Sequence, residues 1–538
     1  DATSTHSWSR ATPSRSSALG SLGRVPDDTS NQSTAAVPTL TMRVRTSWNH
    51  WAWFVPTIAV VVAMRARYIG PPFLADEGGY LAIARAWGRG ATLYRDVFVD
   101  RPQGLVLIFR LLWTIGLGSA VGVRLLALAA CLLLAGACAS IAATLSRPAA
   151  RPVAALAVGV LTSVPQLEGF AVNGELLGSA VGAAALAVTL RAAWTRDEPD
   201  PRLLTIAGVL AAGAISVKQS GFDAPLGAIV AMAVAGVRHR WSWSIARHAS
   251  TRFAIGVAAP VALMVLHGAL TGWSRWWFAI AGYRLEHRNT FTGADWDQFH
   301  RTWSIARPII TPAILVLAAS TIAVLVVRRV RTTTSMRSMW SALAVLGAWS
   351  ASSALALFLG GLFHRHYWLL LMPSIGTAAI VAATTLRSRV VLAVATVVVV
   401  AVPLARTVDA AQGSRVTDIE RLLGDTRPHV QQPVASWFVA HATAGDQLYV
   451  MCFGADVYGA IDADPPYPYL WYLNIRDIDD AVDLMVTMLT GPAAPRFVAV
   501  YQQPDTCDPN GAVATALEAH YRQVDTVAGV AMLEHLEP

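Results

Sequence analysis

Apolar runs of about 20 residues recur along this chain from residue 51 to residue 406, and a helix needs about that length to cross a bilayer. The runs therefore predict an α-helical polytopic membrane protein. The composition agrees, because 54% of the residues are hydrophobic, 14% are charged and the mean hydropathy is +0.46. The basic pI of about 9.6 does not predict a nucleic-acid partner, since most arginines lie in short loops between apolar runs.

We expect eleven transmembrane spans, near residues 51–69, 120–145, 152–166, 175–194, 203–217, 220–236, 253–271, 308–328, 340–359, 367–385 and 390–406. The apolar run 104–118 is shorter and should form an interfacial or partly inserted helix. Three regions follow: a disordered cytoplasmic tail over 1–48, which is rich in Ser, Thr and Arg, a transmembrane domain over 49–406 with a loop over 70–118, and a soluble α/β domain over 407–538.

The loops between these spans predict an orientation. With the N-terminus in the cytoplasm, every cytoplasmic loop carries basic residues, as the positive-inside rule requires. These loops hold Arg147 and Arg151; Arg191, Arg196 and Arg202; Arg238, Arg240, Arg247 and Arg252; Arg328, Arg329, Arg331 and Arg337; and Arg387 and Arg389. A further span over 104–118 would place all of them outside. The eleven-span topology therefore predicts that the loop 70–118 and the C-terminal domain are extracytoplasmic.

The same topology gathers the remaining ionisable residues on the external side. The stretch LADEGGYLAIARAWGRGATLYRDVFVDRPQG, residues 74–104, is the richest in charge; the other external positions are the loop 272–304 and Glu168, Glu175, Lys218, His364, Arg365 and His366. Ionisable residues close to membrane spans are costly and mark functional sites. Their convergence from separate segments predicts an active site at the external face.

Several of these residues have two interpretations. Asp76 could cap an amphipathic interfacial helix that carries Tyr80, or it could act on a ligand for which Gly78 and Gly79 leave room. The Asp100-Arg101-Pro102 triplet could be a surface ion pair or a phosphate clamp. Lys218, the only lysine among 42 basic residues, could be a membrane anchor or a ligand contact.

Other motifs, present or absent, favour some kinds of site over others. His364 and His366 are two residues apart and do not share a helix face, so cations for an anionic ligand are favoured over metal ligands. The chain has no P-loop, GxSxG or HExxH motif.

In the C-terminal domain, QLYVMCFG and RFVAVYQQ predict strands. The segment DADPPYPYLWYLN should pack on the membrane domain or bind carbohydrate. Cys452 and Cys507 could pair in an oxidising compartment, whereas Cys131 and Cys138 should be packing residues.

An Asp-Glu pair after the first span, the LYRD motif, an acidic-basic-Pro triplet and a late His-Tyr element together resemble the GT-C glycosyltransferases. The most similar group is the protein mannosyltransferase and aminoarabinose transferase superfamily, including its bacterial Rgt-like members. The resemblance covers about residues 50–405 and is strongest over 74–104. It implies a GT-C fold and an inverting enzyme that takes a sugar from a polyprenyl-phosphate donor at the outer leaflet.

The resemblance also implies roles for individual residues. Asp76 matches the catalytic carboxylate, with Glu77 beside it, and Asp100 and Arg101 match the acidic-basic pair. Family members usually have Lys-Pro-Pro where this chain has Arg-Pro-Gln, so the resemblance does not define the exact phosphate geometry. The late element matches His366 and Tyr367.

The chemistry assigns Asp76 as the base that accepts a proton from the acceptor hydroxyl. Arg101, Lys218, Arg365 and His366 would bind the donor phosphate, and Tyr80, Asp96, Asp100, Glu168, Glu175 and Tyr367 would support the site or bind the acceptor. The resemblance allows a divalent metal, for which the sequence identifies no ligands.

The predicted protein is thus a glycosyltransferase of a bacterial plasma membrane, acting on a glycan, lipid or protein acceptor. A transporter or flippase of lipid-linked saccharides is the main alternative, although it should carry charge near the bilayer midplane. A scaffold protein and an enzyme that transfers a non-sugar head group are two further alternatives.

Overall fold

The computed structural model describes residues 51–287, 291–328 and 334–536. The tail predicted over 1–48 lies outside the described residues.

Every segment that the sequence predicted as a span forms a helix. In chain order these helices are α1 (Val55–Ala66), α4 (Ala120–Leu145), α5 (Ala150–Leu161), α6 (Gly174–Ala193), α7 (Pro201–Val217), α8 (Asp223–His239), α9 (Trp243–Thr271), α12 (Gly293–Arg328), α13 (Thr334–Gly360), α14 (Leu371–Thr385) and α15 (Arg389–Asp409). Eight helical stretches in the described residues are long and apolar enough to cross a membrane, and α1, α5 and α7 are shorter apolar helices. The chain is a multi-pass membrane protein.

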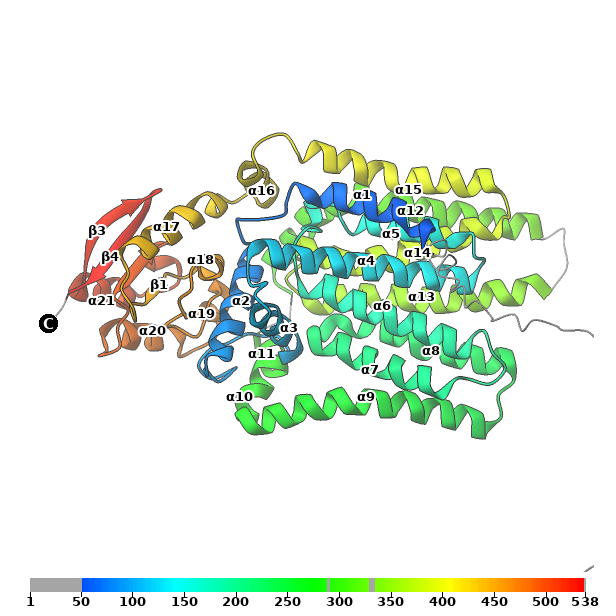
Figure 1. Cartoon of the computed structure of the whole chain (residues 1–538), viewed down its shortest axis with the longest axis horizontal. Coiled ribbons are helices and arrows are strands. Elements are labelled where there is room, and N and C mark those ends of the chain that lie inside the picture. Colours follow the sequence, from blue (N-terminus) through cyan, green and yellow to red (C-terminus); the bar gives the residue numbers. More distant parts are fainter. Residues whose placement is uncertain (1–50, 288–290, 329–333, 537–538) are drawn as a thin grey trace, which may run out of the picture. The chain divides into compact units, whose positions relative to one another are not determined.

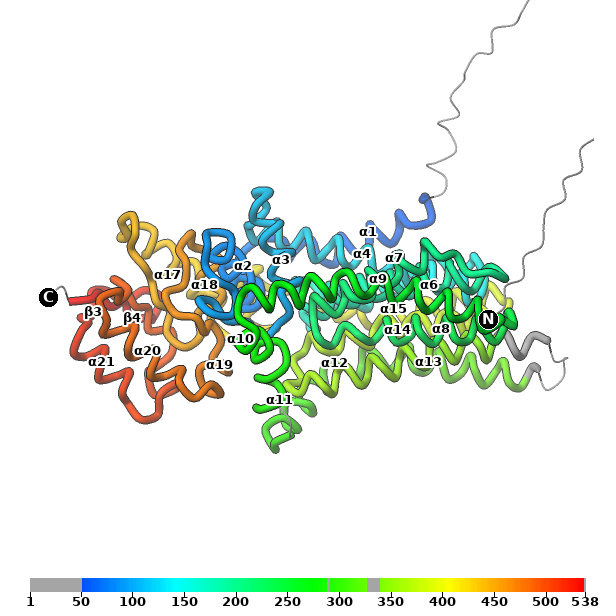
Figure 2. The backbone as a smooth tube through the Cα atoms, turned by 90° about the horizontal axis from the view of Figure 1, so that it is seen from below, coloured from blue at the N-terminus to red at the C-terminus, as the bar shows by residue number. Residues whose placement is uncertain are grey.

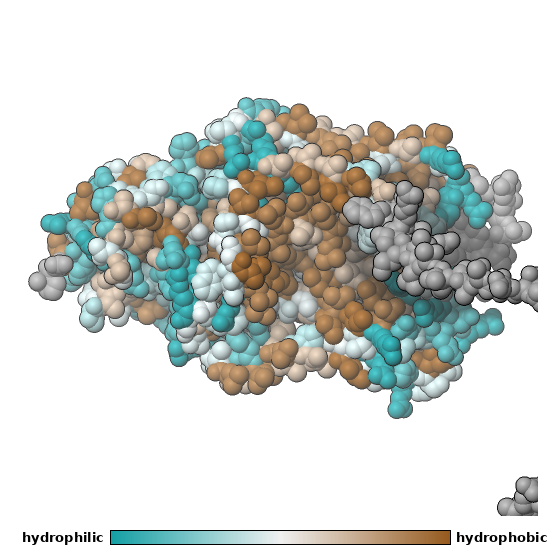
Figure 3. All heavy atoms as spheres, in the orientation of Figure 1, coloured by the Kyte–Doolittle hydropathy of each residue, from teal (hydrophilic) through white to brown (hydrophobic). Residues whose placement is uncertain are grey.

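Burial separates central helices from peripheral ones. The most apolar windows of α6 and α14 are 78% and 83% buried, whereas those of α9 and α15 are only 17% and 22% buried. Residues such as Leu263 and Leu270 of α9 are exposed although they are large and apolar. Figure 3 shows these helices contributing to a broad hydrophobic surface between two more polar ends. Lipid, rather than water, is the solvent that such a surface requires.

The helices run between two different ends of the bundle (Figure 1). The domain end carries the C-terminal domain, and the arginine end holds the α4–α5, α6–α7, α8–α9 and α14–α15 connections. At the arginine end, Arg147 donates a hydrogen bond to the carbonyl oxygen of Thr384, 2.5 Å away, and the His239 ring lies 3.0 Å from Asp197. These contacts place loops that the sequence assigned to one side of the membrane next to one another.

The C-terminal domain, residues 410–536, is a small α/β unit. Its strands β1 (Leu448–Val450), β2 (Phe497–Val500), β3 (Tyr521–Val527) and β4 (Val530–His535) form one sheet in the order β1-β2-β4-β3. The pair β1–β2 is parallel and the other two pairs are antiparallel. The two predicted strands are β1 and β2, whereas the β3–β4 hairpin was not predicted. Helices α16 (Arg415–Leu423), α17 (Arg427–His441), α18 (Ala455–Ala460), α19 (Tyr472–Asp477), α20 (Ala481–Thr490) and α21 (Ala512–His520) complete the domain.

The cysteines divide as the sequence suggested. Cys452 and Cys507 form a disulfide within the C-terminal domain, which settles the pairing that the sequence left open. Cys131 and Cys138 are free and buried within α4.

Helices α2 (Ala75–Gly88) and α3 (Gln103–Thr114) lie between α1 and α4 in the sequence. The short helices α10 (Trp273–Trp277) and α11 (Tyr283–His287) follow α9. The expected short helix within 104–118 is α3. The expectation for α2 was wrong, because this helix does not lie amphipathically at the membrane surface: all residues from Glu77 to Ala86 are buried.

The C-terminal domain is what buries α2. Helix α18 lies beside it in both ribbon views (Figures 1 and 2). A Cβ atom on Gly78 would come within 2.7 Å of the Asp456 backbone, and one on Gly79 within 2.6 Å of the Trp471 ring. The two glycines therefore make room for the C-terminal domain, not for a ligand as the sequence suggested. Arg85 stabilises the contact between α2 and the C-terminal domain by donating hydrogen bonds to the carbonyl oxygens of Tyr458 and Ala463.

Candidate active site

A cavity of about 420 Å³ lies at the domain end, between the helical bundle and the C-terminal domain. Residues that the sequence singled out contribute to its lining from three separate segments: Asp76, Tyr80, Asp100 and Arg101 from the region after α1, Glu168 from the loop before α6, and His364 and His366 from the segment after α13. The predicted convergence at one site is therefore present in the structure for these residues.

Asp76 lies in the first turn of α2 and faces this cavity. The Tyr80 hydroxyl, one helical turn later, donates a hydrogen bond to its Oδ2 atom at 3.3 Å. Burial raises the pKa of the Asp76 carboxyl, although His366 and Arg101 oppose this shift. A carboxylate with a raised pKa, held by a neighbouring hydroxyl, is suited to accept a proton.

Glu77 has a different position from its neighbour. One interpretation of the sequence made Asp76 the N-cap of α2, but the N-cap residue is Leu74. The Glu77 carboxylate accepts a hydrogen bond from the backbone N–H of Leu74 at 3.0 Å. The same carboxylate accepts from Val172 N at 3.0 Å and from Arg124 at 2.6 Å. Glu77 is 0% exposed and does not line the cavity, so it holds the start of α2 against α4 and the loop before α6.

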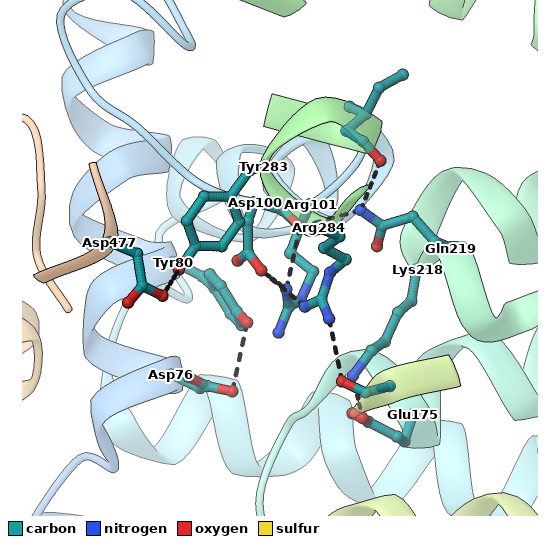
Figure 4. A network of polar contacts seen from close by, with 12 residues as sticks. Asp76, Tyr80, Asp100, Arg101, Glu175, Lys218, Gln219, Tyr283, Arg284 and Asp477 are labelled. Carbon is teal, nitrogen blue, oxygen red and sulfur yellow. Dashed lines mark hydrogen bonds and ion pairs between the residues drawn. The ribbon is translucent and has the colours of Figure 1, made fainter. Parts of the chain in front are cut away.

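Asp100 and Arg101 form the cationic side of the cavity together with Arg284 of α11 (Figure 4). Asp100 Oδ2 lies 2.5 Å from an Arg101 nitrogen and 2.7 Å from Arg284 Nη2. Gln219 fixes the same loop, because its amide donates a hydrogen bond to the Asp100 carbonyl oxygen at 3.0 Å. Burial raises the pKa of Asp100, but the two guanidinium groups outweigh it and keep the pKa below its ordinary value. One carboxylate between two arginines leaves a net positive charge, which suits a phosphate.

A second charged group lies beside the cavity. His366 Nδ1 is 2.8 Å from Glu168, and its Nε2 is 3.8 Å from Glu175. Glu175 is buried and paired with Lys218, whose ammonium group lies 4.3 Å from the centre of the Tyr367 ring. In the view of Figure 4, Asp76 and the Lys218–Glu175 pair lie on opposite sides of the two guanidinium groups. Glu175, Lys218 and Tyr367 do not line the cavity, but Glu175 lies close to His366, which does.

Two predicted residues lie farther from the cavity. Asp96 is exposed and pairs with Arg95, which, together with hydrogen bonds at Thr92, lowers the pKa of Asp96 to about 2. The Arg365 guanidinium lies 3.5 Å from the Leu423 carbonyl oxygen, outside the cavity lining. Neither residue is in contact with the space where a substrate would bind.

Sequence reasoning missed several lining residues. Arg284 lies in the loop 272–304, where its only sequence signal is an arginine within the otherwise apolar FAIAGYRL. Its neighbour Tyr283 donates a hydrogen bond to Asp477 of the C-terminal domain at 3.0 Å. The C-terminal domain also lines the cavity with Leu423, Arg427, Phe453, Trp471, Tyr472, Leu473 and Asn474. The segment DADPPYPYLWYLN thus does pack on the membrane domain, and its last residues also face the cavity.

His364 is a further lining residue, and burial lowers its pKa to about 4. It is therefore neutral at pH 7. In the described residues no group of three or more His, Cys, Asp or Glu side chains is arranged to hold a metal ion. The resemblance allowed a divalent metal without naming its ligands, and no step of the proposed mechanism involves one.

Taken together, the fold and the cavity define a polytopic membrane protein with a cavity beneath a C-terminal α/β domain. No family model matches the sequence, and no curated protein matches it significantly. Similarity is found instead among solved structures, at the level of the fold.

The crystal structure of ArnT from Cupriavidus metallidurans in the apo state superimposes with a TM-score of 0.58 at 15% identity, over 91% of this chain and 98% of that one. ArnT from the same organism bound to undecaprenyl phosphate gives a TM-score of 0.60 at 14% identity, over 90% and 98%. The apo oligosaccharyltransferase of Archaeoglobus fulgidus gives 0.47 at 11% identity, over 88% and 73%. The GT-C resemblance of the sequence is confirmed at the level of the fold.

Proposed function

We propose that this protein is an inverting membrane glycosyltransferase that moves a sugar from a polyprenyl-phosphate donor to an acceptor of the cell envelope. The observation that carries the proposal is the cavity at the domain end. It combines one carboxylate with a raised pKa, Asp76, and a pair of guanidinium groups, Arg101 and Arg284, at the boundary between apolar helices and a polar domain. Such a boundary can receive a lipid tail and a polar head group together.

In this mechanism Asp76 acts on the acceptor. A sugar or alcohol hydroxyl is a weak nucleophile, so a base must accept its proton as the new bond forms. The acceptor oxygen bonds to the anomeric carbon, its proton passes to an Asp76 oxygen, and the bond from that carbon to the phosphate oxygen breaks. A single displacement of this kind inverts the anomeric centre and needs no covalent intermediate.

Arg101 and Arg284 act on the leaving group. Negative charge grows on the phosphate as the sugar departs, and fixed cations stabilise that charge most in the transition state. Asp100 holds both guanidinium groups in place, and Gln219 holds the Asp100 backbone. His366 adds a further donor, oriented by Glu168. The fold shared with a protein crystallised with undecaprenyl phosphate supports a donor of this class.

We further propose that the cavity and the C-terminal domain face away from the cytoplasm of a bacterial plasma membrane. The basic loops gather at the opposite end of the bundle, and the Cys452–Cys507 disulfide suits an oxidising compartment. A membrane-impermeant maleimide applied to intact spheroplasts should label Asp479→Cys in the C-terminal domain but not Glu198→Cys at the arginine end. The reverse pattern would contradict this orientation.

The proposal is tested with the purified full-length chain in lipid nanodiscs and a panel of undecaprenyl-phosphate sugars, with envelope extract as acceptor. Sugar transfer by the native protein is expected, and Asp76→Asn should reduce turnover about 10²- to 10⁴-fold, since it cannot accept the proton. Asp96→Asn is the matched control and should retain native turnover. If Asp76→Asn turned over at the native rate, the base assignment would be wrong; if no donor of the panel reacted with the native chain, the function itself would be contradicted.

The pH dependence gives a second check on Asp76. Because its pKa is raised, the carboxylate becomes protonated at a higher pH than an ordinary aspartate. Turnover should therefore fall, as pH is lowered, before the pH reaches the usual range for an aspartate, about 3.9.

A further inference from the structure

The cavity has two chemically different walls. The wall from the membrane domain carries the charged groups described above. The wall from the C-terminal domain consists of Leu423, Arg427, Phe453, Trp471, Tyr472, Leu473 and Asn474. It contains no carboxylate, and its single cation, Arg427, is already paired with Asp425. Three of these seven residues, Phe453, Trp471 and Tyr472, are aromatic.

Trp471 is the part of that wall that packs on α2, the helix that carries the candidate base. Its ring centre lies 5.6 Å from that of Tyr80, the residue whose hydroxyl binds Asp76. The indole packs directly on α2 because Gly79 has no side chain; a Cβ atom there would come within 2.6 Å of the ring. The position of the ring is therefore fixed by the helix that carries Asp76. The side chain remains partly exposed, and it lines the cavity.

The wall also offers hydrogen-bonding groups. The Trp471 Nε1–H is buried and has no hydrogen-bond partner within the described part of the chain. A buried donor without a partner costs free energy unless a ligand or water satisfies it. Asn474, only 4% exposed, adds an amide that can both donate and accept. Tyr472 stacks on Phe453 with their ring centres 6.2 Å apart, so the aromatic surface extends beyond Trp471.

From these observations we propose that the C-terminal domain binds a sugar ring of the acceptor, with Trp471 as the stacking surface and Trp471 Nε1 and Asn474 as hydrogen-bond donors to its hydroxyls. The inference rests on the proposed function and adds that the acceptor is a saccharide. One face of a pyranose or furanose carries C–H groups, which suit the electron-rich face of an indole, while its hydroxyls need fixed polar partners. The donor sugar is bonded to the phosphate at the arginines, whereas Asp76 acts on the acceptor hydroxyl, so we assign the ring on Trp471 to the acceptor.

The test separates sugar binding from donor binding, using the full-length chain in nanodiscs. Saturation-transfer difference NMR with methyl mannopyranoside, methyl galactopyranoside and methyl arabinofuranoside should detect at least one sugar on the native protein, with saturation of its ring C–H protons. Trp471→Ala should weaken that sugar's binding about 3- to 10-fold. Trp471→Phe, which keeps a ring but loses the N–H, should give an intermediate loss. Trp243→Ala is the control, because Trp243 is exposed at the arginine end.

The affinity for undecaprenyl phosphate is measured on the same preparations. It should be unchanged in Trp471→Ala and weakened in Arg101→Ala. The saccharide proposal would be overturned if no sugar bound the native chain, if Trp471→Ala bound sugar as well as the native chain does, or if Trp471→Ala lost undecaprenyl phosphate to the same extent. An Arg101→Ala variant that kept full affinity for undecaprenyl phosphate would instead contradict the proposed function and leave the sugar result standing.

Discussion

The two ends of the helical bundle both carry many charged residues, but they use them differently. At the domain end, Glu77, Arg101, Glu175 and Lys218 are buried, paired and arranged at or beside a cavity of about 420 Å³. At the arginine end, Arg196 and Arg240 are exposed. Arg147 donates a hydrogen bond to a backbone carbonyl beside a smaller cavity of about 140 Å³ with mostly apolar lining. The number of charges does not distinguish the ends.

What distinguishes them is desolvation. A charge at a water-facing loop costs little and can serve as a topology determinant. A buried charge is costly, so it persists only where partners compensate it or where function requires it. The proposed function places the active site at the domain end, so substitutions at the two ends should have different consequences.

The largest expected effect on stability belongs to the buried Glu77–Arg124 pair. Glu77→Gln removes the charge but keeps the shape, which leaves Arg124 buried without a counter-ion and should cost about 3–5 kcal/mol of folding free energy. Thermal unfolding in detergent should show a clear fall in Tm. Asp96→Asn is the matched control, because its pair with Arg95 is exposed and contributes at most about 1 kcal/mol. Equal Tm values for the two variants would show that burial does not determine how much these two carboxylates contribute to stability.

Arg284 should give the next largest effect, on donor binding. Arg284→Ala removes one of the two guanidinium groups on Asp100, and a charge-assisted hydrogen bond to phosphate contributes about 1.5–3 kcal/mol. The affinity for undecaprenyl phosphate should therefore fall about 10- to 100-fold. Arg95→Ala is the control, because Arg95 is exposed and does not line the cavity, and this variant should bind as tightly as the native chain. An unchanged affinity in Arg284→Ala would exclude this residue from the phosphate site.

Asp456 should give a smaller, pH-dependent effect on stability. Burial raises its pKa to about 6, although Arg427 and Gln431 oppose the shift. A raised carboxyl pKa means that the folded state binds the proton more tightly than the unfolded state, so stability is lost as pH rises from about 4 through 6. Lowering the pH from 7 to 5 should stabilise the protein by about 1 kcal/mol through this group.

Asp456→Asn should abolish that part of the pH dependence, because the amide does not titrate. The measurement is the difference in Tm between pH 7 and pH 5 for the native chain and the variant. The same pH difference in both proteins would show that another group is responsible.

The smallest effect is expected at the arginine end. Arg147→Ala removes a hydrogen bond to Thr384 from a partly exposed site and should cost less than about 1 kcal/mol. Turnover and undecaprenyl-phosphate affinity should be unaffected. A large loss of turnover would mean that the two ends are coupled rather than functionally separate.

Much of the fold follows from local sequence properties. Apolar length alone predicts α1, α4 to α9 and α12 to α15, and the short run that contains α3 was separated from the spans by its length. The external charged residues could also be recognised, because Asp76, Arg101, Glu168 and His366 are conspicuous in apolar surroundings. The same reasoning could not tell Asp76 from Glu77. Adjacent residues on a helix face different directions, and only their partners show that one meets the cavity while the other meets Arg124.

The sequence by itself determined that the chain is a polytopic membrane protein with arginine-rich loops at one end and ionisable residues from separate segments at the other, because hydrophobic length and charge cost are properties of each segment. Only the tertiary structure decided which charges face the cavity, that Arg284 joins Arg101, and that the C-terminal domain supplies an aromatic wall. Those features depend on contacts between residues hundreds of positions apart, such as Gly79 with Trp471, and no local pattern encodes such contacts.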